Sequence, residues 1–277
     1  MTVAEAIRAA TERLTETSDT ARLDAELLMA HALGVSRSEM LIRMMDEPAP
    51  AEFFALIGRR SKHEPVAYIS GIQEFYGREF VVSPDVLIPR PDSEILIETA
   101  LEFCKDGLRV LDLGTGSGAL LLTLLEEYPG LARGYGIDNS HAALEIAKCN
   151  AQRLECERAS FGFFDWRTDR KGLGYALDTF ELYLCNPPYV ETTAKLDRQV
   201  SDYEPHSALF SGEDGLDDYR ILIPELMDAT GTGNGITSIL EIGHTQADAV
   251  MWLAEQEGFT VELRHDLANR PRVLILS

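Results

Sequence analysis

Residues 109–119 read RVLDLGTGSGA, and this stretch decides the fold class. Its first five residues are mainly apolar, as in a short buried strand, and residues 120–127 have the pattern of a helix. Three glycines separate the two, at positions 114, 116 and 118. Because glycine has no Cβ, the chain can turn sharply there and a ligand can approach the amino end of the helix. The stretch therefore predicts a strand, a glycine turn and a helix, with a nucleotide-type ligand at the turn.

The chain after residue 119 continues this alternation of apolar strands and helical segments. Such alternation predicts an α/β fold with a doubly wound, mostly parallel sheet whose ligands bind at the carboxyl ends of the strands. The last two predicted strands have no helix between them, so one of them is expected to be antiparallel. The predicted strands are residues 109–113, 134–138, 159–164, 181–185, 236–242, 260–263 and 273–276.

The amino-terminal part has a different pattern. Apolar residues recur at helical spacing, with Asp19 or Thr20 as the expected cap of a helix that ends at Gly34 and a further helix near 51–60. Aromatic and β-branched residues interrupted by glycine and proline follow, which predicts a hairpin. We expect a helical domain of residues 1–64, a hairpin connector of residues 65–91 and a sheet domain of residues 92–277.

Composition limits the possible partners. The 46 acidic and 25 basic residues give a formal net charge of -21, which disfavours binding to a phosphate backbone. The densest apolar run, residues 119–125, is too short to span a bilayer, and residues 1–10 do not resemble a signal peptide, so we expect a cytoplasmic protein without a membrane partner. The four cysteines form no C-x-x-C pair, and no metal site is expected.

Acidic and aromatic residues follow the next two predicted strands. Asp138 ends the second strand 20 residues after Gly118, where a carboxylate would accept hydrogen bonds from both hydroxyls of a ribose. Both NAD and S-adenosylmethionine carry that ribose. Alternatively, Asp138, followed by Asn139 and Ser140, only caps the next helix. After the third strand, Asp165 could bind an adenine amino group and Trp166 could stack on the ring. The alternative for these two residues is a polar loop with a packed indole.

The stretch LCNPPYV, residues 184–190, joins an apolar strand to a rigid turn. Prolines cannot donate to a sheet, so the strand must stop at Asn186. The side-chain oxygen of Asn186 and the carbonyl oxygen of Pro187 can accept both hydrogens of a planar NH2 group, and Tyr189 can stack on that group. This arrangement suits methyl transfer to nitrogen and has no use in hydride transfer, so it favours S-adenosylmethionine over NAD. The alternative is a turn that merely ends the strand.

These motifs resemble the amino-methylating class I methyltransferases, which have a Rossmann-like sheet and modify adenine, cytosine or glutamine amides. Almost the whole chain is similar to one branch, the bacterial release factor glutamine methyltransferases of the HemK type. The segments that carry the likeness are EPVAYISG (64–71), FYGREF (75–80), VLIPRPDSE (86–94) and YEPHSALFSGEDGLD (203–217). The resemblance implies N5-methylation of the glutamine in the Gly-Gly-Gln loop of peptide chain release factors, with S-adenosylmethionine as methyl donor.

The resemblance also implies roles for residues at matching positions. The helical domain would bind the release factor, and Arg90 with its flanking prolines would shape the substrate channel. Ser93, where threonine is common, and residues 241–244 depart from the family pattern without affecting the chemistry. The expected substrate contacts are Arg90, Asn186, Pro187, Pro188 and Tyr189, of which Asn186, Pro187 and Tyr189 are also catalytic. The expected cofactor contacts are Gly114, Thr115, Gly116, Ser117, Gly118, Asp138, Asp165, Trp166 and Asn186.

Two other functions are compatible with parts of the pattern. An N6-adenine nucleic-acid methyltransferase would share the Asn-Pro-Pro-Tyr turn, but the charge of -21 and the lack of a sizeable target-recognition insert count against it. An inactive cofactor-binding scaffold would need neither an intact asparagine turn nor an intact glycine turn. The sequence leaves open the preferred release factor, the ribosome-bound form as a substrate, and the oligomeric state.

Overall fold

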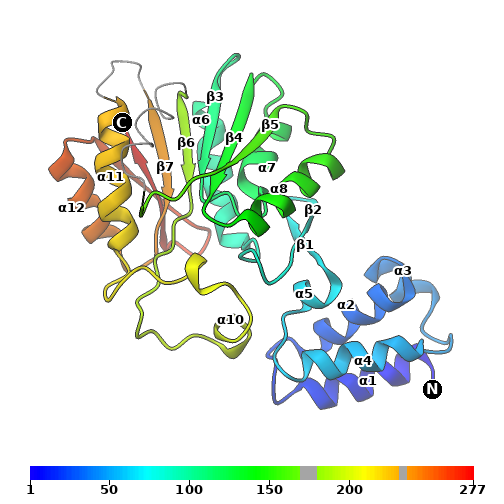
Figure 1. Ribbon diagram of the computed structural model, residues 1–277. Coiled ribbons are helices and arrows are strands. Elements are labelled where there is room, and N and C mark those ends of the chain that lie inside the picture. The colour runs from blue at the N-terminus through cyan, green and yellow to red at the C-terminus, as the bar shows by residue number, and fades with distance from the viewer. Residues whose placement is uncertain (169–179, 231–235) are drawn as a thin grey trace. The chain divides into compact units, whose positions relative to one another are not determined.

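The computed structural model describes residues 1–168, 180–230 and 236–277 (Figure 1). The chain forms two compact units. The helical unit consists of Met1–Ile72 with Leu196–Tyr203, and the sheet unit consists of Gln73–Lys195 with Glu204–Ser277. The division at residues 64 and 91 that the sequence suggests stays a prediction.

The helical unit packs its helices around one apolar core, which includes Leu14 and Phe53. The expected helix that ends at Gly34 is confirmed as α2, and Gly34 adopts the left-handed conformation (φ 67°) that favours glycine at this position. Thr20 takes the N-cap position of α2, but its hydroxyl donates to Asp24 (2.9 Å) and makes no cap bond. The helices are α1 (Val3–Leu14), α2 (Ala21–Leu33), α3 (Arg37–Arg43), α4 (Ala51–Arg60), α5 (Val66–Ser70) and α10 (Arg198–Ser201).

The sheet unit contains a seven-stranded sheet in the order β5-β4-β3-β6-β7-β9-β8. The pairings among β5, β4, β3, β6 and β7 are parallel, whereas β9 pairs antiparallel with both β7 and β8. The predicted mostly parallel sheet with one antiparallel strand among the last two is therefore confirmed. The strands are β3 (Arg109–Leu113), β4 (Arg133–Asp138), β5 (Ala159–Phe163), β6 (Leu182–Cys185), β7 (Thr237–Glu241), β8 (Val261–His265) and β9 (Pro271–Leu276).

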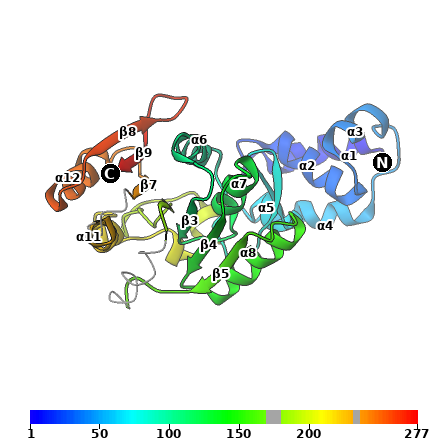
Figure 2. The same ribbon diagram turned by 90° about the horizontal axis from the view of Figure 1, so that it is seen from above.

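Helices cover both faces of this sheet, as Figure 2 shows from above. Alternate residues of a strand point to opposite faces, so Val110 packs with α6 and α7 while Leu111 packs with α11 and α12. Both residues are fully buried. The sheet is thus sandwiched between two apolar layers, which leaves the ends of the strands open for a ligand. The helices are α6 (Glu94–Phe103), α7 (Ala119–Glu127), α8 (His141–Arg153), α11 (Asp217–Thr230) and α12 (Ala247–Glu257).

Within the segment 65–91, for which the sequence predicts a hairpin, β1 (Ile72–Phe75) and β2 (Arg78–Val81) form a separate two-stranded sheet, whereas Val66–Ser70 forms the helix α5. The two turn residues of the hairpin both have positive φ, 51° at Tyr76 and 74° at Gly77, as tight hairpins require. Short 3-10 helices precede α6 (Pro91–Ser93) and follow the sheet's fourth strand (His206–Ala208). None of the helices in the described part of the chain has the length and apolarity needed to cross a bilayer.

Candidate active site

The strand order places the two sequence motifs next to each other. In the sheet, Leu113 of β3 lies beside Ile137 of β4 on one side and Cys185 of β6 on the other. The residues that follow these three are Gly114, Asp138 and Asn186. Because the strands are parallel, the glycine turn, the acid and the asparagine turn meet at one edge of the sheet, as the sequence predicts.

The glycine turn is held by Asp138. Gly114, Gly116 and Gly118 all have positive φ, between 53° and 80°, a conformation that disfavours other residues. The carboxylate of Asp138 accepts hydrogen bonds from the backbone N–H groups of Gly116 (2.9 Å) and Ser140 (2.9 Å). Burial raises the pKa of Asp138, and these N–H donors act in the opposite direction. Each oxygen retains a lone pair for a ligand hydroxyl. The N-cap of α8 is Ser140, whose hydroxyl accepts from the backbone N–H of Ala143 (3.2 Å), so Asp138 itself does not cap that helix.

Two cavities meet the glycine turn. The first has a volume of about 610 Å³, including space open to solvent, and is lined by Asp138 and Trp166 among other residues. The second has a volume of about 440 Å³ on the same measure and is lined by Arg90 and Phe75 among others. Gly114, Gly116 and Asn186 line both cavities, so the asparagine turn lies where the two meet.

The Asn-Pro-Pro-Tyr turn is fixed by polar partners beneath it. The Asn186 side-chain amide donates to the hydroxyl of Ser93 (3.4 Å), which leaves its oxygen available as an acceptor. The Tyr189 hydroxyl donates to the buried carboxylate of Glu241 (3.2 Å), and burial raises the pKa of both groups. Pro187 and Pro188 are buried. Ser93 and Glu241, which stand out in the sequence only as departures from a family pattern, thus support the turn directly.

Trp166 lines the first cavity, whereas Asp165 lines neither cavity. Trp166 is 6% exposed, packs in the apolar core and also lines the first cavity. Its ring lies against the glycine turn, since a Cβ on Gly114 would be 3.1 Å from it. The Trp166 indole is therefore packed, as one of the alternatives from the sequence allows, and it also forms part of the cavity wall. Asp165 accepts from the backbone N–H of Arg167 (3.0 Å) and is not among the residues that line either cavity.

Arg90 lies at the second cavity, as the family resemblance implies. It forms an ion pair with Glu204, whose side chain is almost completely buried and also accepts from the backbone N–H of Ile88 (3.2 Å). The guanidinium is thereby held beside Asn186 and Ser93, which line the same cavity. Glu204 belongs to the segment 203–217, but the sequence alone does not distinguish this buried acid from a surface acid.

Asn150 of α8 is a supporting residue for which the sequence gives no signal. It is fully buried, and its side-chain nitrogen donates to the carbonyl oxygens of Ser117 (2.8 Å) and Val81 (3.0 Å). Its side-chain oxygen accepts from the backbone N–H of Val81 (2.7 Å). One side chain therefore connects the hairpin to the glycine turn.

Burial of Asp112, near the end of β3, leads us to expect that the stability of the protein depends on pH. Burial, together with the nearby carboxylate of Asp138, raises the pKa of Asp112 to about 7, although it accepts from the hydroxyl of Thr115 (2.7 Å). Since the pKa is raised on folding, its contribution to stability is present at low pH and is lost as the pH rises towards 7. We expect Asp112→Asn to raise the free energy of unfolding by roughly 2 to 4 kcal/mol at about pH 8.

Urea unfolding at about pH 4 and about pH 8 tests this prediction. Asparagine keeps the acceptor for Thr115, so the gain is expected to shrink towards zero at the lower pH, where the wild-type carboxyl is protonated. An equal gain at both values would show that ionisation of Asp112 is not its cause.

Two known protein families match parts of this chain. A family described as the PrmC N-terminal domain matches residues 5–71, and one described as a methyltransferase domain matches residues 104–210. A crystal structure of a methyltransferase from Pyrococcus furiosus is similar with a TM-score of 0.50 and 17% identity, covering 73% of this chain and 89% of that one, which shows the fold alone.

Curated relatives match over nearly the whole length. The release factor glutamine methyltransferase of Koribacter versatilis is 39% identical over an alignment of 287 positions, which covers 99% of this chain and 98% of the relative. The protein of the same name from Burkholderia pseudomallei is 40% identical over 269 residues, or 90% of each chain. At this identity and coverage, the chain belongs to the release factor glutamine methyltransferase family.

Proposed function

We propose that this protein transfers a methyl group from S-adenosylmethionine to the side-chain amide nitrogen, N5, of the glutamine in the Gly-Gly-Gln loop of peptide chain release factors. The observation that carries the proposal is the position of Asn186, which lines both cavities beside the glycine turn. One cavity would take the cofactor and the other the glutamine side chain. Family membership supports the same substrate.

The residues of the first cavity suit S-adenosylmethionine. A Cβ on Gly116 would meet no heavy atom within 4 Å, so the turn leaves open space beside its backbone. Asp138 offers acceptors for the ribose hydroxyls, and the apolar ring of Trp166 offers a wall for the adenine. The expected contacts with Thr115, Ser117 and Gly118 would come from the same turn, with Asn186 next to the reactive end. The bound cofactor would supply a methyl group activated by a positively charged sulfonium.

The asparagine turn would orient the amide. The nitrogen of an amide is a poor nucleophile because its lone pair is conjugated with the carbonyl group. The Asn186 side-chain oxygen and the Pro187 carbonyl would accept its two hydrogens, and Tyr189 would stack on the amide plane. Each neutral hydrogen bond contributes only about 1 kcal/mol, whereas correct positioning of two reactants can lower a barrier by roughly 7 to 11 kcal/mol. Orientation would therefore be the main contribution of these residues.

The helical unit would recognise the body of the release factor. The PrmC N-terminal domain family matches residues 5–71, which make up most of this unit. Arg90, held by the buried Glu204, would lie at the entrance for the glutamine loop. A protein substrate also fits the net charge of -21 better than a nucleic acid does.

Mass spectrometry tests the proposed reaction. The purified protein is incubated with S-adenosylmethionine and a purified release factor, and the mass of the peptide that contains Gly-Gly-Gln is measured. We expect one added methyl group on the glutamine amide, absent when Asn186→Ala replaces the wild type. An unmodified peptide, with the cofactor shown to be bound, would contradict the proposal and favour a nucleic-acid substrate or a scaffold.

The Tyr189→Phe variant tests the contribution of the Tyr189 hydroxyl apart from that of its ring. The variant keeps the ring but removes the donor to Glu241, whose other oxygen has no hydrogen-bond partner among the described residues. Removing this donor from a buried carboxyl group, with the Ser93 hydroxyl and the charge of Arg272 still acting on it, is expected to lower the free energy of unfolding by about 1 to 3 kcal/mol. Urea unfolding measures this loss. The control is Tyr128→Phe, which removes an exposed bond to Asp106 (3.3 Å) and should change stability little; an equal loss in both variants would contradict the role given to Glu241.

A further inference from the structure

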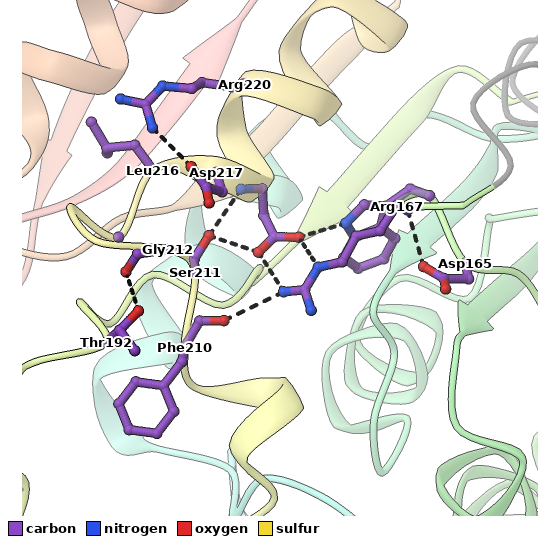
Figure 3. Close-up of polar contacts among 12 residues, drawn as sticks. Asp165, Arg167, Thr192, Phe210, Ser211, Gly212, Leu216, Asp217 and Arg220 are labelled. Carbon is purple, nitrogen blue, oxygen red and sulfur yellow. Dashed lines mark hydrogen bonds and ion pairs between the residues drawn. The ribbon is translucent and has the colours of Figure 1, made fainter.

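One buried carboxylate, that of Asp218 in the first turn of α11, connects several segments around the first cavity. Its side chain is fully buried, and both oxygens accept hydrogen bonds. One oxygen accepts from the indole N–H of Trp166 (2.8 Å) and from Nε of Arg167 (2.8 Å). The other accepts from Nη2 of Arg167 (2.6 Å) and from the hydroxyl of Ser211 (2.7 Å). Figure 3 shows Arg167 and Ser211 reaching this network from two different segments.

The network keeps Asp218 ionised although it is buried. Burial raises the pKa of a carboxyl group, but the donors on Arg167, Ser211 and Trp166 outweigh burial and lower the pKa of Asp218. Ser211 adds a second link, because its hydroxyl also accepts from the backbone N–H of Asp218 (2.9 Å). Three side chains donate four hydrogen bonds to this buried carboxylate. Their positions are fixed, since any movement of one donor group leaves part of the charge without a partner.

The segments joined in this way form the wall of the first cavity. Trp166 and Arg167 line it from the segment after β5, and Pro205, Ser207 and Ala208 line it from the segment that continues to Ser211. That second segment is also tied to the end of the asparagine turn. The backbone N–H of Val190 donates to the carbonyl of Leu209 (2.8 Å), and the N–H of Ser211 donates to the carbonyl of Val190 (2.9 Å). Asp218 itself does not line the cavity.

A buried ion pair is not needed for stability alone. Replacing such a pair by apolar residues of similar volume is often neutral or stabilising, because removing two charges from water is costly. The carboxylate instead fixes the orientation of the side chains that donate to it. The indole of Trp166 and the guanidinium of Arg167 are planar groups, and hydrogen bonds to one carboxylate fix the rotation of both.

We propose that Asp218 is a positioning residue that sets the orientation of Trp166 and Arg167 at the wall of the first cavity. Cofactor affinity then depends on a residue that touches no ligand. The proposal rests on the proposed function in one respect, that the ligand of this cavity is S-adenosylmethionine.

The two tryptophans of the chain make the proposal measurable. Trp166 is 6% exposed, whereas Trp252 on α12 is 58% exposed and does not line the first cavity. In a Trp252→Phe background, tryptophan emission reports Trp166 alone. We expect Asp218→Asn in that background to shift this emission to longer wavelength and to raise the Kd for S-adenosylmethionine about tenfold or more. The rate at saturating cofactor should fall by a smaller factor.

A neighbouring acid provides the matched control. Asp217 precedes Asp218 on the same helix turn, but its side chain is 60% exposed and pairs with Arg220 (3.0 Å). Asp217→Asn is expected to leave both the emission of Trp166 and the Kd unchanged. Ser211→Ala provides a milder perturbation if Asp218→Asn does not fold: it removes one donor to Asp218, and smaller shifts in the same directions are expected.

Three outcomes separate the explanations. Unchanged emission and unchanged Kd in a folded Asp218→Asn variant, or in Ser211→Ala if the former does not fold, would overturn the positioning role. So would a Kd that rises without any change in the emission of Trp166, since the indole would then not be the link. If the Trp252→Phe protein itself binds no S-adenosylmethionine, the proposed function fails and Asp218 has no cofactor to position.

Discussion

Asn186→Ala is expected to lower the rate of methyl transfer by about a hundredfold or more while leaving the fold and cofactor binding nearly unchanged. Among the described residues, the side chain makes one long hydrogen bond, to Ser93 (3.4 Å), so its loss should cost the fold little. What disappears is the acceptor that would orient the glutamine amide. Single-turnover kinetics with a purified release factor measure the rate, and calorimetry with S-adenosylmethionine measures the affinity.

A second asparagine on the wall of the first cavity serves as the control. Asn139 lines that cavity but not the second one, so Asn139→Ala should keep the single-turnover rate at saturating cofactor. A rate like that of the wild type in Asn186→Ala would refute the role given to the asparagine turn. A large loss of cofactor affinity in Asn186→Ala, with a normal rate at saturation, would reassign Asn186 to the cofactor alone.

The sequence predicts the sheet well because its signals are local. Glycines at positions 114, 116 and 118 follow a five-residue, mainly apolar stretch, and the structure shows β3 over Arg109–Leu113 followed by three glycines with positive φ. The alternation of strands and helices is equally local, and parallel strands then have few possible orders. The short helices have no such signal: α3, α5 and α10, at seven, five and four residues, are too short to show helical periodicity.

The meeting of Gly114, Asp138 and Asn186 is predictable for a similar reason. Each follows a buried strand, and the carboxyl ends of parallel strands lie at one edge of a sheet. The residues that hold them in place are not predictable in this way. Asp218 lies 52 residues from Trp166, and Glu241 lies 52 residues from Tyr189, so only the folded chain brings these partners together.

The grouping of residues 196–203 with the helical unit is another feature that local patterns do not show. Within this unit, the Tyr203 hydroxyl donates to the carbonyl of Lys62 (2.8 Å), a contact between residues 141 positions apart. Periodicity reports which face of a helix is buried, but it does not report which distant segment covers that face. Burial and hydrogen bonding of individual side chains therefore require the structure.

Asp138→Ala is expected to weaken S-adenosylmethionine binding by about a hundredfold or more, before any effect on the rate at saturation. Two effects combine. The ribose would lose a charged acceptor for its two hydroxyls, and hydrogen bonds to charged groups contribute about 1.5 to 3 kcal/mol each. The backbone N–H groups of Gly116 and Ser140 would lose their acceptor as well, which loosens the glycine turn.

Asp138→Asn separates these two effects. Asparagine keeps one side-chain oxygen for an N–H donor of the turn but carries no charge towards the ribose. If holding the turn dominates, Asp138→Asn should bind the cofactor much more tightly than Asp138→Ala; if the charged contact with the ribose dominates, the two variants should be similarly weak. Calorimetry on the three proteins decides between these cases. An affinity that is unchanged in Asp138→Ala would rule out both roles, because the carboxylate would then neither hold the turn nor face the cofactor.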